Sequence, residues 1–274
     1  MQNTNTNWHK WQQFFASRSD RQLPDLKSSD DYESVPRSVA RSLAIFQLGE
    51  SGGGTVVEQA RQSTIPGIDE HYADAMKLFV AEENRHAALL AICVRNLGGS
   101  LISSNWTARL FVYARRLVGL RLKVLVLLAA EVVGICYYHL IATQLPQSRL
   151  RSILTQIVND ERAHLHFHCS FLRTQTNSQW RRKVFTVIWR ITMVTAATAV
   201  LIDHRYTLRD LNLTIGIMWR RWTIYSRQAE KLVTNCPALP RDVSPESEPS
   251  NARKTSHDAM RGRYQTAFLA GSVE

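Results

Sequence analysis

The chain has 274 residues, 45% of them hydrophobic, which suits one large domain with appendages or two small domains. Its net charge of +11 excludes an acidic protein, and its four cysteines form no CxxC pair, which excludes a zinc ribbon or a dithiol motif. The basic excess indicates either an ordinary surface or attraction to nucleic acid, a phosphorylated carrier or a membrane surface. Residues 1–15 hold no apolar secretory core, so reduced thiols in a cytoplasmic protein are expected.

Helical periodicity dominates the chain and strand-like alternation is scarce, so the sequence predicts an all-α fold. Residues 1–35 are interpreted as an N-terminal arm, because Pro24, Pro36 and the Ser-Asp cluster between them oppose one continuous helix. A first helix is expected over about residues 39–61. It would end before Pro66, where proline and glycine interrupt the pattern.

Three further helices are expected within the next hundred residues. The second follows Asp69, a suitable N-cap, and ends at residue 97 before two glycines. The third covers about residues 120–145 and stops at Pro146, and the fourth covers about residues 148–172.

Two basic, aromatic helices are expected beyond these, over about residues 180–202 and 208–233. Residues 237–274 are rich in proline, serine and charge, which predicts a disordered tail. The apolar stretches 124–145 and 184–202 resemble membrane spans in composition. A charged residue interrupts each stretch, so buried helices of a soluble bundle are the preferred interpretation.

Two Glu-x-x-His motifs, Glu83 with His86 and Glu161 with His164, place a carboxylate and an imidazole on one face of a helix. Each motif falls on the apolar seam of its own helix. Four ionisable groups on inward faces are costly unless they are paired or bound to a metal ion. The alternative is that the helices are rotated slightly and the groups are exposed.

Two single glutamates complete the pattern, Glu50 in the first expected helix and Glu131 in the third. Glu131 is the more telling, because residues 125–130 and 132–136 around it are uncharged. A lone buried carboxylate would shift its pKa or destabilise the fold, and a cation at that depth explains it. The glycines at 52–54 either make room beside Glu50 for oxygen or a substrate, or mark a helix break or close packing.

This pattern resembles the ferritin-like di-iron carboxylate proteins, in which one Glu from each of two helices joins a Glu-x-x-His motif from each of the other two. The resemblance covers about residues 36–175. It implies a ferritin-like four-helix bundle with a long crossover between its second and third helices. Residues 176–236 would then form two additional C-terminal helices.

The resemblance also implies a ligand set for two iron ions, or for a manganese–iron pair. Glu83 and Glu161 would bridge the two ions. Each ion would have two terminal ligands, which are Glu50 and His86 for one and Glu131 and His164 for the other.

Glu82 and Asp160 directly precede the two motif glutamates. In the oxygen-activating relatives, an acid at this position accepts the ring N–H of the opposite motif's histidine. The resemblance therefore pairs Asp160 with His86 and Glu82 with His164. The alternative is that both are surface acids.

Two further residues share the expected seams. His168, one turn beyond His164, is an extra ligand, a proton shuttle or a hydrogen-bonded core histidine. Tyr138, two turns beyond Glu131, is a core tyrosine or a redox or substrate contact.

The ferritin-like resemblance implies that the second and third bundle helices run parallel, with Glu83 and Glu131 at the same height. One helix from residue 106 to 145 would then require residues 98–105 to span close to 60 Å, whereas eight extended residues reach roughly 28 Å. The sequence therefore predicts a separate crossover helix over residues 106–117, with the break at Val118 and Gly119. This helix would carry Arg109, Arg115 and Arg116 outside the bundle.

The resemblance to the oxygen-activating branch implies a di-iron oxidase or oxygenase that oxidises an organic substrate with O2 and an electron donor. The basic surface favours an anionic or carrier-bound substrate, and a homodimer is among the expected assemblies. The alternatives are a ferroxidase or other iron-handling protein, and a basic adaptor with a vestigial metal site. The Arg-Trp segments of the last helices fit nucleic acid such as tRNA, although amphipathic helices with snorkelling arginines are favoured.

Overall fold

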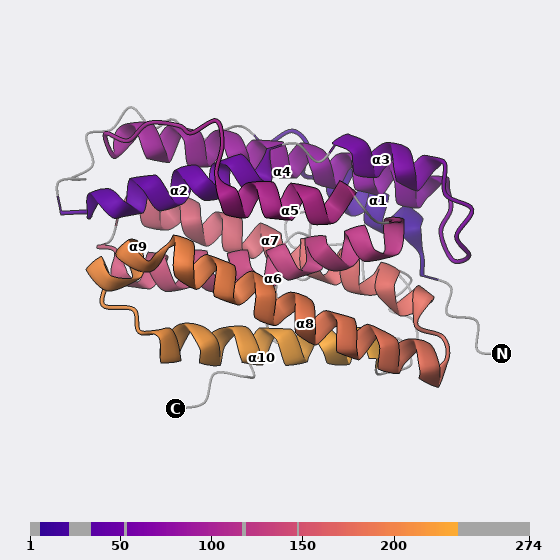
Figure 1. The fold of residues 1–274 in the computed structure, drawn as a ribbon. Helices are drawn as coiled ribbons and strands as arrows, with labels where there is room; N and C mark the ends of the chain where they lie inside the picture. Colours follow the sequence, from indigo (N-terminus) through magenta and orange to yellow (C-terminus); the bar gives the residue numbers. More distant parts are fainter. Residues whose placement is uncertain (1–5, 22–33, 52–53, 117–118, 147, 235–274) are drawn as a thin grey trace, which may run out of the picture.

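The computed structural model describes residues 6–21, 34–51, 54–116, 119–146 and 148–234, and every regular element in these ranges is an α-helix (Figure 1). The predicted all-α class is therefore confirmed for the described residues, while the predicted tail, 237–274, lies outside them. The helices are α1 (Trp8–Ala16), α2 (Arg37–Glu50), α3 (Gly54–Arg61), α4 (Glu70–Asn96), α5 (Trp106–Arg116), α6 (Leu120–Gln144), α7 (Arg149–Gln175), α8 (Gln179–Asp203), α9 (Arg205–Asp210) and α10 (Ile215–Thr234).

The helices pack as two groups that face each other (Figure 1). In one group α2 and α3 lie against α4, and in the other α6 lies along α7. Helix α1 packs on α4, α10 covers α6 and α7, and α8 packs on α6 and α10. The two groups meet where α4 contacts α7, and these are the helices that carry the two Glu-x-x-His motifs.

The ends of α4 are fixed by the residues that the sequence indicates. The Asp69 side chain accepts a hydrogen bond from the Tyr72 backbone N–H at 3.0 Å. At the other end Gly98 adopts a positive φ of 69°, and the N–H groups of Gly98 and Gly99 donate to the carbonyls of Arg95 and Val94. This glycine-based cap satisfies carbonyls that the last helical turn leaves open.

The first predicted helix, residues 39–61, is wrong as one continuous element. Helix α2 ends at Glu50, Ser51 has an extended backbone (ψ 128°), and α3 begins at Gly54. Gly52 and Gly53 lie outside the described residues. Glycine disfavours a helix by about 1 kcal/mol relative to alanine, and a run of three makes a break inexpensive. Glu50 is consequently the last residue of α2.

The predicted break between α5 and α6 is present. Helix α5 ends at Arg116, and α6 begins at Leu120 after Gly119, whose extended backbone caps it (ψ 171°). Residues 117–118 lie outside the described part of the chain. Helix α5 contacts α2, α6 and α8.

The predicted helix over residues 208–233 is also divided, into α9 and α10. Asn212 adopts a left-handed backbone conformation (φ 54°), and Thr214 accepts a hydrogen bond from the Ile217 N–H at 3.2 Å. Asparagine tolerates this conformation better than most residues, so it ends α9 and lets α10 begin anew.

Two of the described helices are long and apolar enough to cross a membrane, α6 and α8. They differ in their surroundings, since 89% of the most apolar window of α6 is buried but only 22% of that of α8. Helix α6 is thus a core helix, whereas most apolar residues of α8 are at least partly exposed.

Candidate metal centre

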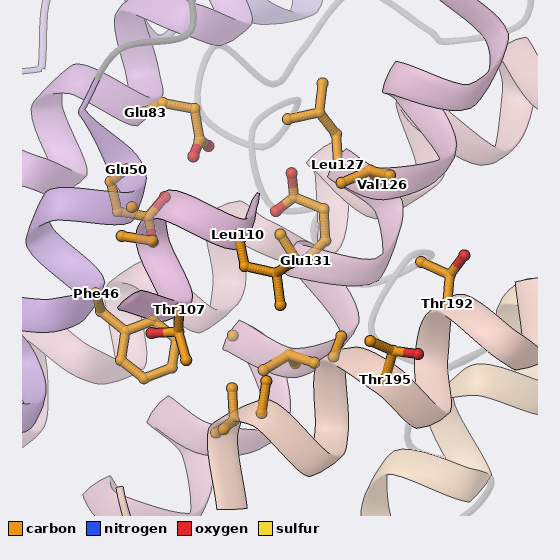
Figure 2. A pocket seen from close by; sticks show the side chains of 18 of the residues that line it. Phe46, Glu50, Glu83, Thr107, Leu110, Val126, Leu127, Glu131, Thr192 and Thr195 are labelled. Atoms are coloured by element: carbon orange, nitrogen blue, oxygen red, sulfur yellow. The ribbon is translucent and has the colours of Figure 1, made fainter. Parts of the chain in front are cut away.

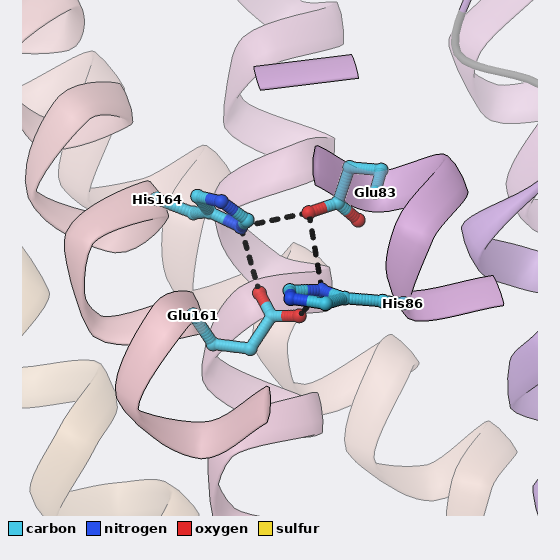
Figure 3. Close-up of side chains that lie close together, drawn as sticks. All are labelled: Glu83, His86, Glu161 and His164. Atoms are coloured by element: carbon cyan, nitrogen blue, oxygen red, sulfur yellow. Dashed lines mark hydrogen bonds and ion pairs between the residues drawn. The ribbon is translucent and has the colours of Figure 1, made fainter. Parts of the chain in front are cut away.

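Four side chains from α4 and α7 converge at the centre of the molecule (Figure 3). They are Glu83, His86, Glu161 and His164, and each offers one ligand atom within 4.8 Å of the others. Both imidazoles are fully buried, and the Glu161 residue is 2% exposed. The spacing of three residues in each motif puts both members on the inward face of their helix. This Glu/His cluster has the donor set and the geometry to hold a metal ion.

Each carboxylate of the cluster lies between the two imidazoles. His164 Nδ1 is 2.7 Å from Glu83 Oε1 and 3.2 Å from Glu161 Oε2. His86 Nδ1 is 3.0 Å from Glu161 Oε1 and 3.8 Å from Glu83 Oε1. Both Nδ1 atoms therefore face the carboxylates, which is the arrangement that a shared cation requires.

Three of these inward atoms are buried without a hydrogen bond within the described residues: Glu83 Oε1, His86 Nδ1 and Glu161 Oε1. A buried polar atom without a partner costs roughly 1–3 kcal/mol. Such atoms on facing side chains fit a cation-binding site better than they fit a closed network of hydrogen bonds.

The outward nitrogens of the two histidines contact the acids that the sequence pairs with them. His86 Nε2 lies 3.4 Å from Asp160 Oδ2, and His164 Nε2 lies 3.1 Å from Glu82 Oε2. Both acids are buried rather than on the surface, at 3% and 7% exposure. Acceptors in this position keep a proton on Nε2 and leave Nδ1 free to bind a metal.

Arg18 links the two acids, a role that the sequence interpretation missed. Its Nε donates to Glu82 Oε1 at 3.0 Å and its Nη2 donates to Asp160 Oδ1, while Arg21 Nη1 donates to the same Asp160 oxygen at 2.9 Å. Both arginines follow α1, inside the predicted N-terminal arm. The sequence feature that could have located them is the helical spacing of the aromatic residues of α1, because Trp8 and Phe15 lie on one buried face of this helix.

Burial, hydrogen bonds and neighbouring charges determine whether Asp160 and His86 are ionised. Burial opposes ionisation of Asp160, but its hydrogen bond with His86 and the Arg18 charge lower its pKa to about 2. Burial likewise opposes a charged His86, yet the hydrogen bond to Asp160 and the negative charge of Glu161 raise its pKa to about 9. Without a metal ion the cluster therefore balances its carboxylates with protonated imidazoles.

Glu131 and Glu50 lie at the edge of the cluster and face the same space as Glu83 (Figure 2). Glu131 Oε2 is 3.9 Å from His164 Nδ1, and Glu50 accepts a hydrogen bond from the Tyr138 hydroxyl at 2.8 Å. Burial, followed by the negative charges of the motif glutamates, raises the pKa of both carboxyls well above the usual range. The structure thus brings all six predicted ligands to one region, with four of them in closest contact.

His168 stands one turn beyond His164 and borders Glu131. Its Nε2 lies 3.3 Å from Glu131 Oε1, and its ring meets that of Phe79 edge-on at 4.7 Å. Burial lowers the pKa of His168 to about 3, so the ring is neutral. Tyr138 is fully buried, and its contact with Glu50 satisfies its hydroxyl.

A cavity of about 490 Å3 adjoins the carboxylates (Figure 2). Its floor includes Glu50, Glu83, Glu131 and Glu161, and its walls are apolar side chains from α2, α5, α6 and α8. No lysine or arginine of the described residues lines it. An apolar molecule in this cavity would lie beside the carboxylates of the Glu/His cluster.

No protein-family model matches the chain, and no curated protein or solved structure matches it. A functional assignment therefore depends on the cluster, on the residues that orient it and on the adjoining cavity.

Proposed function

We propose that the chain is a ferritin-like carboxylate protein that binds two metal ions, iron or a manganese–iron pair, and oxidises an apolar organic substrate with O2. The observation that supports this most strongly is the buried Glu/His cluster, whose unpartnered inward atoms lie beside an apolar cavity. Glu83 and Glu161, each between the two histidines, would bridge the ions. Glu50 with His86, and Glu131 with His164, would complete the two coordination sets. When bound, the ions supply the reduction of O2, which no protein side chain performs.

The residues around the histidines prepare the site for cations. Asp160 and Glu82 accept from the Nε2–H groups, so the Nδ1 atoms face inward and can bind a metal ion once their own protons have left. The hydrogen bonds with the two histidines, together with the charge of Arg18, lower the pKa of both buried acids and favour their ionised forms. The histidine orientation is therefore set before a metal arrives, which lowers the cost of binding.

Protons must leave the site when cations enter it. The raised pKa values of Glu50 and Glu131 favour the protonated forms of both carboxyls in the metal-free protein. Ligand carboxylates are deprotonated, so metal binding releases these protons and those on the histidine Nδ1 atoms. Metal affinity should accordingly rise with pH.

The cavity supports a neutral, apolar substrate. An anionic group at its floor would meet four carboxylates, and no lysine or arginine of the described residues is present there to pair with it. The basic residues of the chain lie outside the cavity lining, so the net charge of the chain gives no information about the charge of the substrate. The cavity volume of about 490 Å3 falls within the range of small-molecule sites.

Metal stoichiometry and substrate-dependent O2 consumption test the proposal. Protein loaded anaerobically with Fe2+ should hold about two ions per chain, and Glu131→Ala should lose at least one. Glu58→Ala, which removes an exposed glutamate of α3, is the matched control and should keep both. An unchanged metal content in Glu131→Ala would contradict the site.

The substrate class has a separate readout. O2 uptake by the iron-loaded protein should be stimulated by neutral aliphatic or aromatic compounds, and less by carboxylic acids of the same size. Rapid O2 uptake that no organic compound alters would instead indicate iron handling, and would contradict an oxygenase.

A further inference from the structure

Helix α8 carries a regular stripe of exposed apolar side chains. Val187, Ile191 and Val194 are 57%, 62% and 51% exposed, and they follow one another at steps of four and three residues. This spacing puts them on one side of the helix. Three branched apolar residues in such a row form a continuous apolar surface, which is uncommon on a soluble monomer.

Helix α5 extends this surface. Trp106, Leu110 and Tyr113 are 48%, 44% and 61% exposed and lie four and three residues apart on one side of α5. We call these three residues together with Val187, Ile191 and Val194 the apolar face. Leu110 and Ile191 also line the cavity beside the metal centre. The cavity therefore borders the apolar face, and Figure 2 shows Leu110 of α5 and Thr192 and Thr195 of α8 around it. A cavity mouth between these two helices would open within the apolar face.

The charges around the apolar face are mostly basic. Helices α5 and α8 hold seven Lys and Arg and one acid, Asp203, the last residue of α8. Over the C-terminal helices as a whole, residues 179–234, ten Lys and Arg outnumber three Asp and Glu. Basic residues beside an apolar helix face, with Trp and Tyr among them, are the composition of helices that lie in the interface of an anionic membrane.

The opposite side of α8 belongs to the protein core. Phe185, Trp189 and Met193 are buried, and the Trp189 indole donates to the Ser226 carbonyl of α10 at 3.1 Å. Packing on α6 and α10 therefore keeps α8 in the fold. Its exposed side is left for lipid contact in the membrane plane, and a spanning orientation would break this packing.

We propose that the chain docks on an anionic lipid bilayer through the apolar face, with the cavity mouth turned toward the acyl chains. A lipophilic molecule would then pass from the bilayer to the cavity without crossing water. A second copy of the chain on the same face would cover the mouth. The proposal extends the proposed function by naming the source of the substrate, but docking itself depends on α5 and α8 and on no metal ion.

Vesicle flotation with the full chain tests the docking. The protein should float with vesicles of phosphatidylcholine and about 30% phosphatidylglycerol, and float less with phosphatidylcholine alone, because anionic lipid adds about 1 kcal/mol per basic residue near the surface. Metal-free and metal-loaded protein should behave alike. A failure of the proposed metal site would therefore leave this result unchanged.

A double variant, Val187→Glu with Val194→Glu, places two charges in the apolar face without touching the cavity. It should lower the partition onto anionic vesicles roughly tenfold or more. The control, Gln13→Glu with Thr155→Glu, adds the same charge at exposed positions of α1 and α7 and should bind as the unmodified chain does. Equal binding by the two double variants would overturn the proposal.

Two further measurements make the outcome definite. Brominated acyl chains should quench part of the tryptophan fluorescence of the unmodified chain, and Trp106→Phe should reduce that part. Light scattering measures the molecular mass in solution and so tests whether a second copy of the chain covers the apolar face instead of a membrane. A stable dimer that Val187→Glu with Val194→Glu dissociates, together with no vesicle binding, would assign the face to a second copy and overturn membrane docking.

Discussion

Arg18 connects the two acids that orient the histidines, although it lies 64 residues from Glu82 and 142 residues from Asp160 in the sequence. All three side chains are buried, at 8%, 7% and 4% exposure. Without this cation, the two buried carboxylates would keep the histidines, Arg21, which is 30% exposed, and the nearby charge of Arg85.

Arg18→Met keeps the length of the side chain and removes its charge. We expect a loss of metal affinity of about 10–100-fold, because the acids then orient the imidazoles less firmly. We also expect unfolding to become easier by about 3–5 kcal/mol, the usual effect of removing one partner of a buried pair. Competition with a metal indicator and urea denaturation measure the two effects.

Arg61→Met is the matched control, since Arg61 is 50% exposed and lies 3.7 Å from the half-exposed Asp74. Exposed pairs contribute less than about 1 kcal/mol, so metal affinity and stability should hardly change. Equal metal affinities in the two variants would show that Arg18 has no influence on the cluster.

His204 gives a pH dependence that is separate from the metal centre. It is 3% exposed, its Nδ1 contacts Ser42 Oγ at 2.7 Å, and burial lowers its pKa to about 4. The unfolded chain, with an ordinary histidine pKa of about 6.5, binds the proton first as the pH falls. Stability contributed by the neutral ring is therefore present above about pH 6.5 and decreases between about pH 6.5 and 4.

Urea titrations of the metal-free chain and of His204→Gln at pH 7 and pH 5 measure this contribution. The unmodified chain should lose about 2 kcal/mol more than the variant does between these values, by proton linkage. Parallel pH profiles for the two proteins would show that His204 is not held neutral by the fold.

Individual site residues differed in how far the sequence could identify them. The two motifs, and the pairing of Asp160 and Glu82 with the opposite histidines, follow from helical spacing and from the ferritin-like resemblance. Arg18 could not be assigned, because spacing within one helix carries no information about a partner that arrives from a distant segment. The same limit applies to Tyr138, whose contact with Glu50 depends on how α2 and α6 pack.

Among the elements, helix ends with a capping residue were predictable and internal interruptions were less so. Asp69, Gly98 and Gly119 act at the ends where the sequence places them. The division between α9 and α10 was missed because apolar residues continue through it at helical spacing. Left-handed Asn212 is the local feature that overrides that pattern.

Gly99 lies where the end of α4 meets α2, so a side chain there should disturb the helix pair. An added Cβ would lie 2.8 Å from Ala40 Cβ and 3.1 Å from the Val94 carbonyl oxygen. We expect Gly99→Ala to lower the free energy of unfolding by about 1–3 kcal/mol, as overpacking does.

The control for this change is Gly216→Ala near the start of α10, where the nearest atom, Thr214 Oγ1, is 3.9 Å from the added Cβ. Alanine is the better helix former, so this variant should gain up to about 1 kcal/mol. Thermal and urea denaturation of both variants measure whether each change raises or lowers the free energy of unfolding. A stable Gly99→Ala protein would mean that α2 yields easily at this contact.

The Glu/His cluster joins helices from both packed groups, so a metal ion bound there should stabilise the entire fold. A ligand that binds only the folded state adds about 3 kcal/mol when present at 100 times its dissociation constant. We expect anaerobic Fe2+ to raise the midpoint of thermal unfolding and a chelator to reverse the rise. Glu161→Ala should show no such rise, and an equal rise in that variant would place the stabilising metal elsewhere.

The all-α class and the central cluster were predictable from the sequence, whereas the cavity and the apolar face were not. Residues 184–202 are apolar on nearly every side of the helix, so periodicity could not show which side would pack. Because α8 packs on α6 and α10, Phe185, Trp189 and Met193 are buried and Ile191 stays exposed. Tertiary contacts of this kind are set by the partner helices rather than by local pattern.

The contact between Arg18 and Asp160 also sets an order of events during translation. Helix α1 leaves the ribosome before α4 and α7, yet Arg18 meets Asp160 only after a further 142 residues have been made. At roughly 5–20 residues per second this takes on the order of 10–30 seconds. Throughout that interval the aromatic side of α1 has no complete binding site, because Phe15 packs against Phe167 and His164 of α7. The centre therefore cannot reach its final geometry while α7 is still inside the ribosome, and a nascent chain arrested before Asp160 should lack a preformed cluster.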